Sequence, residues 1–169
     1  AFHEEDDQEA IIQRVQESGK GQHLKLVYVE TPANPTNALI DISMCRAVAD
    51  HFASEEHEVA LAVDNTYMGP LWSHPLQLGA DLVIYSATKY IGGHADVMLG
   101  VIAVSTEVQF QRIKYTANAM GNCPGPDDCY LGLRGLRTLS VRLERHQKNA
   151  ITVAAWLKSR PEVDRVLYP

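Results

Sequence analysis

The sequence has no excess of basic residues. Its 169 residues include 15 Lys and Arg against 21 Asp and Glu, which gives a formal net charge of −6 and a pI near 5.6. Proteins that bind nucleic acid normally carry a basic surface, so this balance argues against a nucleic-acid partner. A phosphate group, if one is bound, must be held by local contacts.

Long apolar runs are also missing, although 46% of the residues are hydrophobic and the chain is long enough to bury a core. No run approaches the roughly 20 residues that a membrane-spanning helix needs, so we expect no membrane partner. The first residues, AFHEEDDQEAI, hold acids where a signal peptide would hold basic residues. We expect them to belong to the interior of a longer protein.

Cysteine is scarce. Cys45, Cys123 and Cys129 are an odd number at irregular spacing, without a CxxC pair. Disulfide frameworks and zinc sites normally show paired cysteines, so we expect reduced thiols, no bound metal and a cytoplasmic location.

Apolar runs alternate with helical patterns along the chain. Four short runs rich in β-branched residues predict strands covered on both faces, at residues 24–30, 59–64, 81–86 and 97–104. Helical spacing of apolar residues predicts helices at 6–18, 41–56, 105–120 and 129–160. Gly135 predicts a break in the last of these helices. The alternation predicts an α/β fold with a mostly parallel sheet and right-handed crossovers.

Polar residues stand at the ends of three predicted strands. Glu30 is followed by TPANP, Asp64 by NTY and Ser86 by ATK. Ligands of open α/β sheets bind in the crevice outside the carboxyl ends of the strands, so we expect these residues to meet at one cleft. No glycine-rich loop follows the first strand, which argues against a flavodoxin-like nucleotide binder.

A lysine, a buried carboxylate and nearby hydroxyls are the groups that pyridoxal 5'-phosphate (PLP) requires. Lys89 would bind the aldehyde through its amine and later move a proton. Asp64 would keep the ring nitrogen protonated. Ser86 and Thr88 would donate hydrogen bonds to the phosphate without a basic surface. The glycines of YSATKYIGG are expected to let the turn pass close to the ligand.

Each of these residues also has an ordinary role. A lysine after a strand is commonly a solvated loop residue, and an aspartate or serine in that place commonly forms a turn or a helix cap. The joint pattern, with Asp64 and Lys89 at adjacent predicted strand ends, favours a cofactor site.

A resemblance to a known family rests on three stretches. They are ETPANPT, AVDNTYMGPLWSHPLQLGADLVIYSATKYIGGHADVMLG and LRGLRTLSVRLERH. These resemble the Cys/Met metabolism family of PLP-dependent enzymes, the cystathionine γ-lyase, methionine γ-lyase and cystathionine β-lyase group. The resemblance covers nearly the whole chain and is most specific from residue 63 to residue 100. It implies part of the three-layer α/β/α large domain of the aspartate-aminotransferase-like, fold type I enzymes.

The motifs carry the family's roles onto individual residues. Lys89 resembles the catalytic lysine that binds the cofactor aldehyde, and Asp64 resembles the partner of the ring nitrogen. Ser86 and Thr88 match the hydroxyls that contact the phosphate. Asn34 in TPANP matches an asparagine near the ring oxygen and the substrate carboxylate, although Asn before Pro also commonly forms a turn.

Other residues near these motifs are weaker candidates. Thr66 is a weaker candidate for a ring contact. His94 is interpreted as a packed structural residue, and Tyr85 and Tyr90 as packing residues, since neighbouring strand residues point to opposite faces. Four arginines at near-helical spacing are interpreted as a solvated or interface face: Arg134, Arg137, Arg142 and Arg145.

The resemblance also predicts how the chain is organised. Residues 1–160 are expected to be part of the PLP-binding large domain, and residues 161–169 the start of a C-terminal small domain. The family's ring-stacking tyrosine and substrate-carboxylate arginine match no residue here, so we expect the middle of a longer subunit. The family's shared active sites imply a homotetramer built from catalytic dimers.

The resemblance leaves the reaction open between related chemistries. The front half looks most like the γ-lyase and γ-synthase branch, whereas GPDDCYLGLRGLRTLSVRLERHQ looks closer to the β-lyases. We predict a carbon–sulfur lyase that acts by α,γ- or α,β-elimination on a small sulfur amino acid such as cystathionine or methionine. The alternatives are a γ-replacement enzyme, either a cystathionine γ-synthase or an O-acyl-homoserine sulfhydrylase, and a catalytically inactive truncated paralogue that acts as a binding module.

Overall fold

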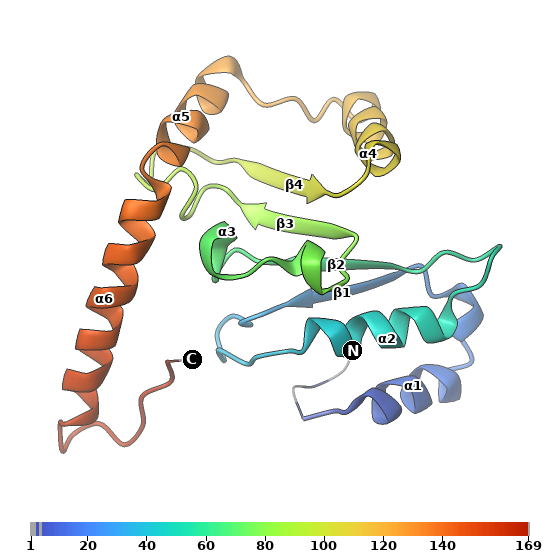
Figure 1. The fold of residues 1–169 in the computed structure, drawn as a ribbon, viewed down its shortest axis with the longest axis horizontal. Helices are drawn as coiled ribbons and strands as arrows, with labels where there is room; N and C mark the ends of the chain where they lie inside the picture. The colour runs from blue at the N-terminus through green and yellow to red at the C-terminus, as the bar shows by residue number, and fades with distance from the viewer. Residues whose placement is uncertain (1–2, 4, 169) are drawn as a thin grey trace.

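The computed structural model describes residue 3 and residues 5–168 (Figure 1). Four strands form one sheet: β1 (Leu26–Glu30), β2 (Ala60–Asp64), β3 (Leu82–Ser86) and β4 (Gly100–Val104). The α-helices are α1 (Gln8–Glu17), α2 (Ile42–Phe52), α3 (Gly69–Trp72), α4 (Glu107–Ala119), α5 (Pro126–Leu136) and α6 (Leu139–Lys158). Two short 3-10 helices complete the described elements, η1 (Gly21–His23) and η2 (Pro75–Leu78).

The sheet has the strand order β1-β2-β3-β4. Strands β1, β2 and β3 are parallel, and β4 runs antiparallel to β3, so the prediction of a mostly parallel sheet is confirmed. Glu30 is level with Asp64, and Asp64 is level with Ile84. The carboxyl ends of the three parallel strands therefore lie at one edge of the sheet, the edge along which α6 runs in Figure 1.

Capping residues explain where three of the helices begin. Asp7 accepts a hydrogen bond from the backbone N–H of Ala10 at the start of α1, and Asp41 accepts two at the start of α2. Thr106 does the same for α4. Such side chains satisfy N–H groups that have no partner within a helix. The break predicted at Gly135 is confirmed, because α5 ends at Leu136 and α6 begins at Leu139.

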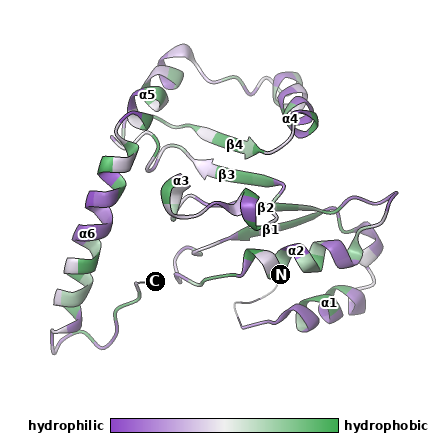
Figure 2. Ribbon diagram, viewed as in Figure 1, coloured by the Kyte–Doolittle hydropathy of each residue, from purple (hydrophilic) through white to green (hydrophobic). Residues whose placement is uncertain are grey.

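The hydrophobic core lies between α2 and one face of the sheet. From α2, Ile42, Cys45 and Ala49 are buried in the same cluster as Val29 and Val63 of the strands. Figure 2 shows the central strands mainly in the hydrophobic colour, whereas α6 alternates between the two extremes. Burial of such apolar surface is the main favourable contribution to folding.

The opposite face of the sheet is less covered than the sequence pattern predicts. Leu26 and Tyr28 of β1 and Ile102 of β4 keep about half of their surface accessible, 49%, 51% and 49% respectively. The strand pattern predicts cover on both faces, but among the described residues this is wrong for these three positions. Composition records how apolar a strand is and does not identify the element that covers it.

All three cysteines are free thiols. Burial, with a smaller contribution from the charge of Asp41, raises the pKa of the Cys45 thiol to about 11, so this sulfur stays protonated. No helix within the described part of the chain is long and apolar enough to cross a membrane.

Candidate functional site

Three residues at the ends of β2 and β3 form one hydrogen-bonded unit. The backbone N–H of Thr66 donates to Oδ1 of Asp64 at 3.0 Å. The Thr66 hydroxyl in turn accepts from the backbone N–H of Ser86 at 2.8 Å. The structure therefore brings Asp64 and Ser86 together, as the sequence predicts. It gives Thr66 the role of a link between them, while a ring contact for Thr66 stays a prediction.

The second carboxylate oxygen of Asp64 is held by Tyr28. The phenol O–H of Tyr28 donates to Oδ2 of Asp64 at 3.2 Å. Desolvation by burial, followed by the negative charge of Asp64, raises the pKa of Tyr28, so the phenol keeps its proton and remains a donor. Sequence reasoning missed Tyr28. Its signal is the period of two in β1, which puts Tyr28 on the same face as Glu30, level with Ala62 and beside Asp64.

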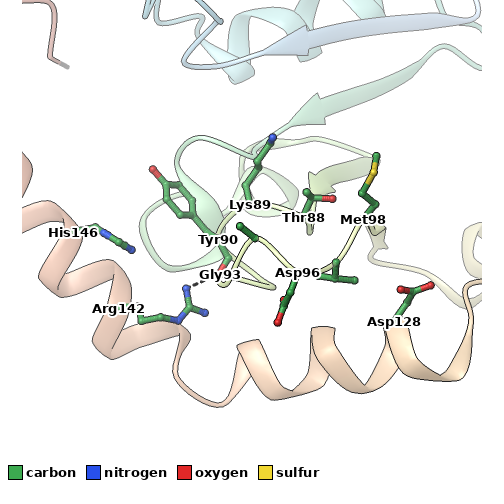
Figure 3. A pocket seen from close by; sticks show the side chains of 11 residues that line it. Thr88, Lys89, Tyr90, Gly93, Asp96, Met98, Asp128, Arg142 and His146 are labelled. Carbon is green, nitrogen blue, oxygen red and sulfur yellow. Dashed lines mark hydrogen bonds between the residues drawn. The ribbon is translucent and has the colours of Figure 1, made fainter.

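Lys89 lies in a closed turn directly after β3. Its backbone N–H donates to the carbonyl of Ser86 at 3.0 Å, and its own carbonyl accepts from the N–H of Gly93 at 2.8 Å. The side chain is exposed and lines a hollow of about 770 Å³. Figure 3 shows the amine extending away from Asp96 and Arg142, which lie across the same hollow. A lysine held by its backbone with a free amine can reach a bound molecule.

The two predicted phosphate ligands differ in how their hydroxyls are used. The Thr88 hydroxyl accepts from the backbone N–H of Leu99 at 2.9 Å and lies 3.4 Å from the Leu99 carbonyl oxygen. The Ser86 hydroxyl has no hydrogen bond to any residue that the structure describes. Ser86 is therefore the better placed donor, and both phosphate contacts stay predictions.

Asn34 lies in the turn after β1. Its backbone N–H donates to Oε2 of Glu30 at 3.2 Å, and Glu30 is level with Asp64 in the sheet. The Asn34 side chain is exposed. The structure thus places Asn34 at the same edge of the sheet as Asp64 and Lys89, and its cofactor and substrate contacts stay predictions.

The sequence predicts a solvated or interface face for the four arginines, and two of them form polar contacts within the chain. Arg134 of α5 pairs with Asp96, and this ion pair holds the pKa of the Asp96 carboxyl below its usual value. Arg142 of α6 donates to the carbonyls of Tyr90 and Gly135, both at 2.8 Å. The near-helical spacing identified a helix but not the turn packed against it. Arg137 and Arg145 are exposed, in agreement with the prediction.

The two glycines of the turn make room for protein atoms. A Cβ at Gly92 would meet Val97 and the carbonyl of Ala87, and a Cβ at Gly93 would fall on the guanidinium of Arg142. Gly93 also has a φ of +74°, which favours glycine. Close packing within the protein therefore accounts for both glycines, and the close approach of this turn to a ligand stays a prediction. His94 differs as well, because it is exposed and not packed, with Nδ1 2.8 Å from the carbonyl oxygen of Gly92.

The donor set fits PLP. The site offers an exposed amine on Lys89, a carboxylate on Asp64 whose two oxygens are already oriented by donors, and an uncommitted hydroxyl on Ser86. These are the partners of an aldehyde, a pyridine nitrogen and a phosphate. No group of three or more metal-ligating side chains occurs within the described residues.

Comparisons with known proteins agree with this chemistry. The model of the family described as Cys/Met metabolism PLP-dependent enzyme matches residues 2–169. Over 145 residues, 86% of the chain, the sequence is 48% identical to cystathionine gamma-lyase of Homo sapiens, covering 35% of that protein. Cystathionine gamma-lyase of Dictyostelium discoideum is 47% identical, and the match covers 36% of that protein. A probable cystathionine gamma-synthase of Herpetosiphon aurantiacus is 43% identical, and the match covers 44% of that protein.

A solved structure is similar over most of the chain. The crystal structure of metB from Corynebacterium glutamicum matches with a TM-score of 0.80 and 38% sequence identity, over 90% of this chain and 40% of that one. This likeness confirms the predicted fold class. The chain spans less than half the length of each of these relatives.

Proposed function

The chain belongs to the Cys/Met metabolism family of PLP-dependent enzymes, and from this membership we propose that the natural subunit is a carbon–sulfur lyase acting on a sulfur amino acid. We favour α,γ-elimination from cystathionine, because cystathionine gamma-lyases from two distant organisms are 47% and 48% identical to the chain. The observation that carries the proposal is the joining of Asp64, Ser86 and Lys89 at one edge of the sheet.

Each residue has a task that its surroundings permit. Lys89 would bind the cofactor through Nζ and would take and return the substrate α-proton on the same atom. Asp64, fixed by Tyr28 and Thr66, would hold the proton on the ring nitrogen. Ser86 would donate its hydroxyl hydrogen to the phosphate. PLP, when bound, supplies an electron sink for the bonds that break at the substrate.

The test of this function is a comparison of two reactions on the purified natural subunit with PLP. With cystathionine and water alone, we expect cysteine, a ketoacid and ammonium to be released in equal amounts. With an activated homoserine and a thiol, we expect elimination to outrun thioether formation. Faster thioether formation would instead establish the γ-replacement enzyme, which the likeness to the probable cystathionine gamma-synthase supports.

Removal of the Ser86 hydroxyl and removal of the Thr88 hydroxyl should have different effects. Because a hydrogen bond to a charged group contributes about 1.5–3 kcal/mol, we expect Ser86→Ala to weaken PLP binding about 10- to 100-fold. Thr88→Val removes the acceptor of the Leu99 N–H, so its main effect should be a loss of about 1 kcal/mol in the free energy of unfolding. Titration of the apo-protein with PLP and thermal unfolding measure the two effects. A Thr88→Val protein of unchanged stability but weaker PLP binding would reverse the assignment.

The proposal also covers the cellular location and the oligomeric state of the enzyme. We place the enzyme in the cytoplasm and expect a homotetramer built from catalytic dimers, which light scattering of the natural protein would measure. The remaining alternative from the sequence is a catalytically inactive truncated paralogue that acts as a binding module. In that case the natural protein would bind no PLP.

A further inference from the structure

We propose that Arg142 is a positioning residue for Lys89, which it holds in place by binding the backbone of the turn that follows this lysine. The inference rests on the proposed function, because it concerns the amine that would bind PLP. The proposal gives α6 a role in the site. The sequence alone predicts no such role for its arginines.

Arg142 makes hydrogen bonds to two segments that are far apart in the sequence. Its Nη1 donates to the carbonyl of Tyr90, the residue after Lys89, at 2.8 Å. Its Nη2 donates to the carbonyl of Gly135 at 2.8 Å and approaches that of Ile91 at 3.5 Å. Its Nε donates to the Thr138 hydroxyl at 3.0 Å. One guanidinium therefore ties the lysine turn to the junction of α5 and α6.

The packing around this guanidinium leaves the turn little freedom. A Cβ on Gly93 would fall on the Arg142 guanidinium, and a Cβ on Gly135 would fall on the carbonyl oxygens of Ile91 and Gly92. The N–H of Gly93 also closes the turn onto the carbonyl of Lys89 at 2.8 Å. A shift of Arg142 is thus transmitted to the peptide group of Lys89 itself.

The bonding of Arg142 indicates positioning and not ligand binding. No carboxylate within the described part of the chain forms an ion pair with it, whereas its neighbour Arg134 is paired with Asp96. Four of its five N–H groups are directed at protein oxygens, which leaves one for any other molecule. Only a planar guanidinium can serve this many acceptors at once, so lysine would not replace it.

The experiment compares two ligands that differ only in the group facing Lys89. Pyridoxal phosphate carries an aldehyde that can bond to the lysine, and pyridoxine phosphate carries an alcohol that cannot. The affinities of both are measured by titrating the natural apo-subunit and its variants Arg142→Lys, Arg142→Ala and Arg145→Lys. Arg145 is the matched control, because it lies on the same helix, is exposed, and its side chain forms no hydrogen bond with the described residues.

We expect the preference for the aldehyde over the alcohol to fall about tenfold or more in both Arg142 variants, since small displacements of a reacting group carry costs of this order. The preference should be unchanged in Arg145→Lys. Added guanidinium ion should restore part of it in Arg142→Ala. Thermal unfolding of each apo-protein shows that the variants are folded, and Arg142→Lys decides the question if Arg142→Ala does not fold.

An equal loss of affinity for both ligands would overturn the inference, because it would show a structural role without an effect on Lys89. Unchanged affinities for both would overturn it as well. These outcomes leave the proposed function intact, provided that the unmutated subunit prefers the aldehyde. An unmutated subunit that binds the two phosphates equally would contradict the proposed function, and the inference with it.

Discussion

Replacing Lys89 with alanine in the natural subunit should abolish covalent attachment of PLP and lower the rate of elimination by about 10²- to 10⁴-fold or more. A loss of about 10²- to 10⁴-fold is expected from removal of the proton-transferring group alone. Lys89 is exposed and its backbone bonds do not involve the side chain, so the free energy of unfolding should change by less than about 0.5 kcal/mol. Activity would thus be lost from a folded protein.

The measurement combines the cofactor absorbance, the mass of the subunit after borohydride reduction, and ketoacid release. Lys148→Ala, an exposed lysine on α6, is the matched control and should leave all three unchanged. If reduction still fixed the cofactor to the Lys89→Ala protein, another lysine would be the attachment site. The assignment of Lys89 would then be wrong.

Asp64→Asn should lower the turnover number by about 10²- to 10³-fold while PLP still binds. The change keeps the shape of the side chain, and an amide oxygen can still accept from the Thr66 N–H. It removes the negative charge that would hold a proton on the ring nitrogen, and the loss of one such electrostatic partner has a cost of this order. The effect should therefore appear mainly in the turnover number.

The protonation of the ring nitrogen can be followed directly by the ¹⁵N chemical shift of labelled PLP bound to the protein. We expect a protonated nitrogen in the unmutated subunit and a largely unprotonated one in Asp64→Asn. Asp127→Asn, at an exposed position in the first turn of α5, serves as the control. A protonated nitrogen in the Asp64→Asn protein would assign this role to another group.

The sequence predicted the parts of the site that depend on short-range order. Asp64 and Ser86 end apolar strands, and the rule for parallel sheets places such ends at one edge. Lys89 follows within three residues, so its position needs no long-range information. The same holds for the strands, each of which lies inside its predicted range, and for the break near Gly135.

The contacts that support the site were not predictable in this way. Arg142 is separated by about fifty residues from the turn it binds, and a helical pattern does not record which carbonyls lie opposite. The period of two could place Tyr28 on a face of β1, but not beside Asp64, because that requires the pairing of β1 with β2. Pairing and packing between distant segments decide these contacts, and a single sequence carries little record of them.

The link through Thr66 also sets a length. Asp64 and Ser86 belong to neighbouring strands, whose spacing in a sheet is about 4.8 Å, and the Thr66 side chain bonds across that gap to the Ser86 N–H. Under the proposed function, this separation would match the distance between the ring nitrogen and the phosphate of PLP. Selection by that distance, and not by net charge, would let an acidic protein retain an anionic cofactor.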